Sequence, residues 1–354
     1  MLSTAAAEQE TITAPAAEQE TIAAPAAEQE TVYFARIDRA HRPDPTPRAV
    51  AIGNFDGVHR GHQAVLAEAR DSARAAGLPL CVLTFDPHPA VVLGRSPPPL
   101  LTVLERKAEL LRRAGVDEVL VRTFDAEFAG YSPERFVSDL LVARLSARAV
   151  IVGQNFRFGH DRAGDRATLE ALGKEHAFEV RGFALHGDER GPFSSTRVRQ
   201  AILAGDVAEA GAVLGRPHAF SGVVGRGDQR GRTLGFPTAN VEQVPEVVPA
   251  NGVYAVAVDS LDAQGGARAL AAGVMNIGTR PTVDAAPRQT REVHLFDFEG
   301  DLYDQRLRVH VLERLRAEQK FASLDELRAQ IDRDAKRARE ITASVKSGPD
   351  GAFG

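Results

Sequence analysis

The sequence predicts an α/β plus β chain, in which a domain with a parallel sheet precedes an antiparallel β-barrel. The chain has 354 residues, which is more than a single hydrophobic core usually serves. From Ala49 to about Arg181, short apolar runs alternate with amphipathic runs, which is typical of strand–helix repeats. After Gly215, short alternating segments follow glycine and proline turns, which is typical of an antiparallel barrel.

The N-terminal segment is a repeat with a period of ten residues. Ala-Ala-Glu-Gln-Glu-Thr begins at Ala6, Ala16 and Ala26, with Pro15 and Pro25 between the copies. Each copy offers one isoleucine or valine, which is too little apolar surface to offset the entropy of ordering. We therefore expect residues 1–31 to form a disordered tail.

The next domain is expected to span residues 32–214. Its buried runs predict strands at 49–52, 80–85, 118–121, 149–152 and 178–180. Between the strands, Val65, Leu66, Ala69 and Ala73 recur at helical spacing, as do Leu104, Ala108 and Leu111. Ser132-Pro133 predicts a helix start, with a capping hydroxyl followed by proline at the first helical position. This alternation predicts a parallel sheet covered by helices on both faces.

The second domain is expected to span residues 215–345. Its strands are predicted at 220–224, 252–258, 271–276, 292–298 and 307–315. Ser323 and Glu326 form a capping box that predicts a closing helix. Residues 346–354 are expected to fray. The apolar face of the closing helix is predicted to hold Leu324, Leu327, Ile331 and Ala338.

Composition excludes several classes of protein. The net charge of −5 argues against a general binder of nucleic acid or anionic membranes. No apolar run approaches the ~20 residues that span a bilayer, and the N-terminus lacks a secretory signal. Cys81, the single cysteine, excludes an internal disulfide and fits a reducing compartment. We expect a cytoplasmic protein, and the sequence leaves open a weak homo-oligomer.

The string from Gly53 to His62 follows the first predicted strand directly. A glycine turn between a strand and a helix presents free backbone N–H groups to an anion. His59 and His62, three residues apart, are expected to lie on one side of the helix and donate hydrogen bonds to phosphate oxygens. Gly61 is expected to leave space for the ligand. A lone His-x-x-His pair would favour ordinary surface or metal-binding histidines, but the whole string favours a phosphate site.

A second glycine-rich string runs from Gly227 to Asn240. Its glycines permit close approach of the backbone to a phosphate chain. Thr238 and Asn240 are two residues apart and are expected to project to the same side of an extended segment. Their oxygens are hard ligands suited to Mg²⁺. The alternative is a plain glycine-rich hairpin. No Gly-x-x-x-x-Gly-Lys-Ser/Thr string is present, which argues against a P-loop ATPase.

The first string resembles the signature of nucleotidyltransferases with a His-x-Gly-His motif. With Gln63 and the preceding Gly-Asn-Phe-Asp-Gly, it resembles the FMN adenylyltransferase half of the bacterial bifunctional riboflavin kinase/FAD synthetases. The likeness extends over about residues 32–342 and implies a Rossmann-like nucleotidyltransferase domain. Further matching segments occur in the same order, at 84–89, 101–107, 115–117, 124–125, 132–136, 152–159 and 194–199.

This resemblance implies the roles of residues in the first domain. Catalytic roles fall to His59, His62, Asn155 and Arg199. Relatives are expected to carry aspartate at position 155, and asparagine there removes a charge beside phosphates. The flavin is expected at Phe85, Pro87, Phe156 and Arg157. ATP and its phosphates are expected at Gly53, Asn54, Phe55, Asp56, Gly61, Ser195 and Thr196.

The second string resembles the riboflavin kinase signature and implies a barrel domain with a closing helix. Thr238 and Asn240 are the implied metal ligands, and Asn276 is an implied flavin contact. Glu292 is the implied base for the riboflavin hydroxyl, although without the motif a solvent-facing glutamate would be the preferred interpretation. Phosphate contacts are implied at Gly227, Gly231, Arg232, Gly235 and Thr238.

Together these expectations describe an enzyme that phosphorylates riboflavin and then adenylylates FMN, with ATP and Mg²⁺. Its implied partners are small-molecule substrates only. A nucleotidyltransferase for another phosphate ester would leave the second string unexplained. A flavin-binding sensor without turnover is the other alternative, against which the combined presence of His59, His62, Thr238, Asn240 and Glu292 argues.

Overall fold

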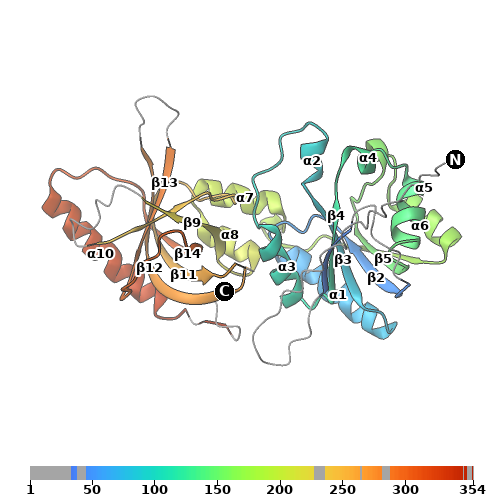
Figure 1. Cartoon of the computed structure of the whole chain (residues 1–354), viewed down its shortest axis with the longest axis horizontal. Helices are drawn as coiled ribbons and strands as arrows, with labels where there is room; N and C mark the ends of the chain where they lie inside the picture. The colour runs from blue at the N-terminus through green and yellow to red at the C-terminus, as the bar shows by residue number, and fades with distance from the viewer. Residues whose placement is uncertain are drawn as a thin grey trace, which may run out of the picture.

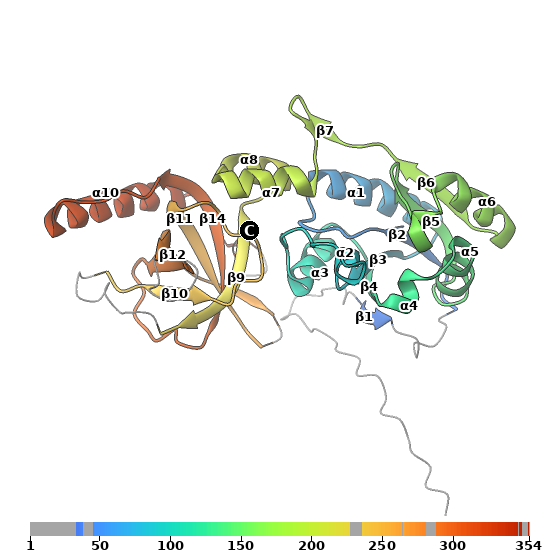
Figure 2. The ribbon, with the colours of Figure 1, turned by 90° about the horizontal axis from the view of Figure 1, so that it is seen from above.

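The computed structural model describes residues 33–37, 45–226, 236–263, 265–280, 288–345, 347–348 and 353. An open sheet with helices and a closed barrel lie side by side (Figure 1). Helices α7 (Ser195–Ala204) and α8 (Val207–Leu214) lie between them (Figure 2). Both predicted fold classes are confirmed, in the predicted order.

The open sheet has six parallel strands in the order β1-β4-β3-β2-β5-β6. The prediction missed β1, which pairs with β4 at the edge of the sheet. It placed the last strand at 178–180, so that it starts one residue before β6 and ends three residues before the end of β6. A small antiparallel hairpin, β7 (Gly187–Asp188) and β8 (Gly191–Pro192), follows the sheet. The strands are β1 (Tyr33–Ile37), β2 (Arg48–Ile52), β3 (Leu80–Asp86), β4 (Glu118–Thr123), β5 (Ala147–Gly153) and β6 (Glu179–Phe183).

Helices cover both faces of this sheet, so its central strands are buried on both sides. Alternate residues of β2 enter two separate cores, with Val50 on one face and Ala51 on the other. The predicted cap is confirmed, since Ser132 accepts a hydrogen bond from the backbone N–H of Arg135. α1 (Arg60–Ala75) and α3 (Leu104–Arg113) cover one face. The other face and the connections hold α2 (Pro89–Val92), α4 (Ala126–Ala129), α5 (Pro133–Arg135), the π-helix η1 (Phe136–Val142), the 3₁₀ turn η2 (His160–Arg162) and α6 (Arg166–His176).

Six antiparallel strands close the barrel in the order β10-β13-β12-β11-β14-β9. The prediction missed β10, which is short and polar. It also extended β13 too far, because Phe296 and Asp297 lie in a turn where Asp297 adopts a left-handed φ of +52°. The strands are β9 (His218–Gly225), β10 (Ala239–Glu242), β11 (Gly252–Leu261), β12 (Ala267–Arg280), β13 (Arg288–Leu295) and β14 (Arg306–Arg316).

The closing helix α10 (Leu324–Thr342) packs on the outside of the barrel. Ser323 accepts a hydrogen bond from the N–H of Glu326, as the capping box predicts. Leu324 was expected on the packed face but is 64% exposed, because it occupies the first turn before the helix meets the barrel. Most of the C-terminal tail lies outside the described residues, and within it the Phe353 N–H donates to Asp259 at 2.9 Å.

The two bodies contact each other through specific polar pairs. Arg308 of β14 lies 3.1 Å from Glu109 of α3. The N–H of Val247 donates to the Leu100 carbonyl at 2.7 Å, which ties the β10–β11 connection to the segment before α3. None of the helices in the described part of the chain combines the length and apolar character needed to span a membrane.

Candidate active sites

The first candidate site lies where the strand order of the sheet reverses. β2 lies next to β3 on one side and next to β5 on the other, so the strand order reverses between β2 and β5. Open α/β sheets bind ligands at such a reversal, outside the carboxyl ends of the strands. The segment Gly53–His59 follows β2 and leads into α1. The segments that follow β3 and β5 begin at Pro87 and Gln154. The sheet therefore brings three of the predicted segments to one edge.

His59 and His62 form a stacked pair at the start of α1. Their ring centroids are 3.7 Å apart with the planes 20° from parallel. His59 is the N-cap, and its Nδ1 accepts a hydrogen bond from the His62 N–H at 3.3 Å. In a neutral His59 the proton is therefore on Nε2, which can donate to an anion. His62 Nδ1 is buried and has no hydrogen-bond partner among the described residues.

Both imidazoles are held in the neutral form. Burial lowers the pKa of His59 from 6.5 to about 4, and the nearby Arg216 adds to this effect while Asp56 opposes it. Burial, then the neighbouring His59 and Lys107, hold the pKa of His62 well below its usual range. A bound polyphosphate would oppose these effects by favouring the charged forms.

Gly61, which is expected to leave space for a ligand, lies against the His59 ring. A Cβ at this position would lie 3.1 Å from His59 Nδ1, 3.2 Å from His59 Cε1 and 3.3 Å from Phe193 Cβ. The missing side chain therefore makes room for the His59 ring, because the chain folds the imidazole back over its own helix start.

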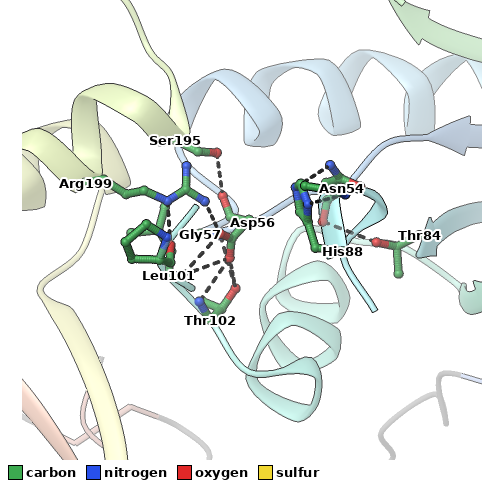
Figure 3. A network of polar contacts seen from close by, with 11 residues as sticks. Asn54, Asp56, Gly57, Thr84, His88, Leu101, Thr102, Ser195 and Arg199 are labelled. Atoms are coloured by element: carbon green, nitrogen blue, oxygen red, sulfur yellow. Dashed lines mark hydrogen bonds and ion pairs between the residues drawn. The ribbon is translucent and has the colours of Figure 1, made fainter. Parts of the chain in front are cut away.

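Asp56 organises the loop from within (Figure 3). Its carboxylate accepts hydrogen bonds from the N–H groups of Leu101 and Thr102, at 3.2 and 3.0 Å, and from the Thr102 hydroxyl at 3.1 Å. It also pairs with Arg199, and the residue is only 6% exposed. A carboxylate has no proton to donate to a phosphate, so the predicted place of Asp56 in the ATP site stays a prediction.

The predicted Ser-Ser-Thr segment opens α7 beside this loop. Ser194 caps the helix by accepting from the Arg197 N–H at 3.2 Å. The Ser195 hydroxyl donates to the Asp56 carbonyl at 2.8 Å, and Thr196 is exposed. Arg199, one turn later, donates from Nε to the Pro99 carbonyl at 2.6 Å in addition to its pair with Asp56 (Figure 3). The structure thus brings Ser195 and Arg199 to the loop across about 140 residues.

The remaining predicted residues lie around the same edge of the sheet. The Asn54 amide lies 3.2 Å from His88 Nε2 (Figure 3). The Phe55 ring is buried and lies 5.1 Å from the His62 ring, so only its backbone could face a ligand. Gly53 leaves room for that ring, since a Cβ there would lie 3.1 Å from it.

The expected flavin contacts also lie at strand ends. Phe85, at the end of β3, packs edge-to-face on Phe124 with centroids 5.9 Å apart, and Pro87 is exposed. Asn155 is exposed in the turn after β5. Next to it, Phe156 is half-buried and stacked on Phe158, and Arg157 pairs with Asp165 at 3.2 Å.

Lys107 is a residue that sequence reasoning left without a role. It lies in α3, is only 7% exposed, and its ammonium has no hydrogen bond or ion pair in the described part of the chain. Burial lowers its pKa, against the opposing effect of Asp56 and Asp86. It lowers the pKa of both His62 and His88, which places its charge among the candidate phosphate ligands. The Leu101-Thr102…Lys107 segment, which matches the family, was the signal in the sequence that could have indicated a role for Lys107.

The second candidate site is a row of polar residues across three strands of the barrel. Asn240 of β10 is paired in register with Glu292 of β13, and Glu292 is paired with Asn276 of β12. Residues paired in this way point to the same face of a sheet. Their neighbours Val241, Val293 and Met275 fill the barrel core, so the row faces outward.

Thr238 lies two residues before Asn240 and is half-buried. His294 of β13 lies 2.9 Å from the Pro237 carbonyl, which anchors the approach to β10. Four predicted phosphate contacts, Gly227, Gly231, Arg232 and Gly235, lie outside the described residues.

The described residues hold no group of three or more histidine, cysteine, aspartate or glutamate side chains that could bind a metal ion. A hydroxyl, an amide and one carboxylate near each other suit Mg²⁺ that takes most of its ligands from phosphates and water. Asn240 and Glu292, which are paired in register, supply the amide and the carboxylate, and Thr238, two residues before Asn240, supplies the hydroxyl.

Two protein families match this chain in succession. The family described as FAD synthetase matches residues 41–197, and the family described as Riboflavin kinase matches residues 214–342. Each match covers one of the two bodies.

Three relatives that are similar to this chain carry the name bifunctional riboflavin kinase/FMN adenylyltransferase. The protein of Escherichia coli (strain K12) is 45% identical over 84% of this chain and 93% of its own length. That of Pseudomonas fluorescens is 42% identical over 85% and 95%, and that of Bacillus subtilis (strain 168) is 36% identical over 84% and 93%. A solved structure described as a macrolide-efflux protein, from Streptococcus pneumoniae, is 32% identical, covers 88% of this chain and 99% of its own, and superposes with a TM-score of 0.76.

Proposed function

This chain belongs to the family of bifunctional riboflavin kinases/FMN adenylyltransferases, and we propose that its two bodies divide the two reactions between them. The chain phosphorylates riboflavin to FMN and joins FMN to AMP, using ATP in both steps. Residues 32–214 carry the adenylyl transfer and residues 215–345 the kinase. The observation behind this division is that each matched family covers one body of the structure. The names of the relatives give no support to a sensor without turnover.

Adenylyl transfer takes place at the start of α1. A phosphate oxygen of FMN attacks the α-phosphorus of ATP, and pyrophosphate leaves. The stacked imidazoles of His59 and His62 and the backbone N–H groups at the helix start donate hydrogen bonds to the phosphate oxygens. These hydrogen bonds stabilise the negative charge that develops on those oxygens. No covalent enzyme intermediate is required, since positioning and charge stabilisation supply the acceleration.

Lys107 holds the polyphosphate in this site. Its side chain is only 7% exposed and its ammonium forms no ion pair in the described part of the chain, so a triphosphate would supply an anionic partner. Asp56 has a positioning role, because it fixes Arg199 and the Leu101–Thr102 segment beside the same loop. Asn155 and Phe156, at the end of β5, and Phe85 and Pro87, at the end of β3, are placed to contact FMN.

The kinase reaction takes place on the outer face of the barrel. The riboflavin 5′-hydroxyl attacks the γ-phosphorus of ATP, ADP leaves, and Glu292 accepts the proton of the hydroxyl. Asn276 contacts the flavin beside Glu292, with which it is paired in register. Thr238 and Asn240 would hold Mg²⁺, which would supply charge neutralisation to the phosphates.

The test is to incubate the purified chain with riboflavin and ATP, with and without Mg²⁺, and to separate the flavins by chromatography. FMN followed by FAD, only when Mg²⁺ is present, is the expected result. Riboflavin that binds but stays unchanged would refute the proposal and support the sensor. A parallel incubation supplies FMN in place of riboflavin, and FAD formed only in that incubation would refute the kinase assignment alone.

A further inference from the structure

The loop before α1 has an unusual backbone. Phe55, Gly57 and Val58 have φ angles of +48°, +83° and +39°, so three of four successive residues lie in the left-handed region. Glycine adopts such a conformation freely, whereas a β-branched valine does so only when its surroundings impose it. Something outside the loop must therefore hold Val58 in place.

Arg216 supplies much of that restraint. Its Nη2 donates to the Gly57 carbonyl at 2.6 Å, and its Nη1 donates to the Val58 and Leu214 carbonyls, both at 3.3 Å. Gln63 donates to the Val58 and Leu214 carbonyls at 2.8 and 2.9 Å. One guanidinium and one amide thus bind the loop to the end of α8.

These bonds set the direction of the donors at the start of α1. In a trans peptide the C=O and N–H groups point to opposite sides of the chain. Because the Val58 carbonyl is turned toward Arg216 and Gln63, the N–H of His59 in the same peptide points away from them. His59 is the N-cap of α1, where the candidate phosphate donors begin.

Arg216 belongs to the barrel side of the molecule. It lies between the end of α8 at Leu214 and the start of β9 at His218, about 160 residues from the loop it holds. Gly57, Thr102 and Arg106 of the sheet body, with Arg216 and His218, line a small cavity of about 10 Å³, room for one water at most. The contact between the bodies is therefore tightly packed at this point.

Arg216 remains charged although it is buried. Burial, and then the nearby Arg106 and Arg113, lower its pKa to about 9, while Glu109 opposes this effect. The guanidinium therefore stays protonated near neutral pH and keeps its donors. A second hydrogen bond from the barrel side also restrains this loop. The Val247 N–H donates to the carbonyl of Leu100, which precedes the Leu101–Thr102 segment that binds Asp56.

We propose that Arg216 is a positioning residue for adenylyl transfer, and that the start of the barrel domain completes the phosphate loop of the sheet domain. This inference rests on the proposed function of that loop. Arg216 does not touch the reacting atoms. It fixes the peptides whose N–H groups meet the phosphates, so the adenylylation site needs the barrel in place even though its reactive side chains all lie elsewhere.

The test compares Arg216→Met, which keeps the apolar stem, with Arg216→Lys, which keeps one cationic donor. Arg181→Met is the matched control, since Arg181 forms an exposed pair with Glu179 on the edge strand β6. The kcat of FAD formation from supplied FMN should fall by roughly 10²-fold in Arg216→Met, with partial recovery in Arg216→Lys. FMN formation from riboflavin should stay within twofold in every variant.

Hydrogen–deuterium exchange provides a readout that needs no turnover. Exchange of the amides of residues 58–62 should speed up by at least tenfold in Arg216→Met, with the later turns of α1 unchanged. FAD formation within threefold of the parent chain, or loss of both activities together, would overturn the proposal. If the parent chain itself makes no FAD, the proposed function fails, whereas unchanged exchange in Arg216→Met refutes the role of Arg216 independently.

Discussion

Gly61→Ala is the substitution that best distinguishes an effect of the histidine-pair geometry on catalysis from an effect on the stability of the fold. Gly61 lies in the first turn of α1, where alanine is favoured over glycine by about 1 kcal/mol. The added Cβ would lie 3.1 Å from His59 Nδ1 and 3.3 Å from Phe193 Cβ, so a neighbour must move by a few tenths of an ångström. Because these two effects oppose each other, the free energy of unfolding should change by less than about 1 kcal/mol.

The effect on catalysis should be much larger than the effect on stability. His59 stacks on His62 at 3.7 Å, so a displaced His59 ring disturbs both imidazoles. We expect kcat for FAD formation to fall by roughly 10- to 100-fold, with FMN formation unchanged. The assays are chromatographic separation of flavins over a range of ATP concentrations, and urea denaturation.

Gly211→Ala is the matched control. Gly211 lies in helix α8, where an added Cβ would lie 3.6 Å from the Arg216 carbonyl oxygen, an ordinary contact distance. This variant should gain about 1 kcal/mol of stability and keep both activities. Unchanged FAD formation in Gly61→Ala would refute the reasoning. A raised KM for ATP with unchanged kcat would instead show that Gly61 makes room for the ligand.

The other predictions concern single ionisable groups. His62→Ala should lower FAD formation from FMN by orders of magnitude while riboflavin phosphorylation persists, and equal effects in the two assays would contradict the assignment. Glu292→Gln should lose FMN formation but still adenylylate supplied FMN, which chromatography of the flavins would show. Lys107→Met should raise the KM for ATP in FAD formation by about tenfold and weaken inhibition by pyrophosphate, with Lys107→Arg retaining part of both; unchanged values would exclude a phosphate contact. Burial lowers the pKa of His59 and His218 from 6.5 to about 4, so between these pH values the unfolded chain binds protons that the folded chain does not. Stability should therefore fall as the pH drops through this window, by about 2 kcal/mol per histidine at pH 5, and equal urea midpoints at pH 7 and 5 would contradict this.

Much of the fold could be predicted because its signals are local. The central strands of the open sheet are buried on both faces, so they stand out as continuous apolar runs such as Ala49–Ile52. The strands that were missed lack this signal. β1 is an edge strand next to the repeat tail, and β10 is a four-residue segment that begins at the end of the second motif, with Asn240 on its outer face.

The candidate site divides in the same way. That the two histidines lie on one side could be predicted from a spacing of three residues in one helix turn. The hydrogen bond and ion pair that join Asp56 to Ser195 and Arg199 span about 140 residues, and no periodicity reports such a contact. The contact of Gly61 with the His59 ring could not be predicted, because the direction in which a side chain folds back cannot be derived from spacing.

The central claim, that two separate phosphate sites carry two different ATP reactions, is tested most directly by isotopic labelling. The purified chain would be given riboflavin, Mg²⁺ and ATP labelled either at the α- or at the γ-phosphorus, and label would be measured in separated FMN and FAD. We expect γ-label to enter FMN and to be retained in FAD, whereas α-label should enter FAD only. Label from the α-phosphorus in FMN, or flavins that carry no label from either ATP, would contradict it.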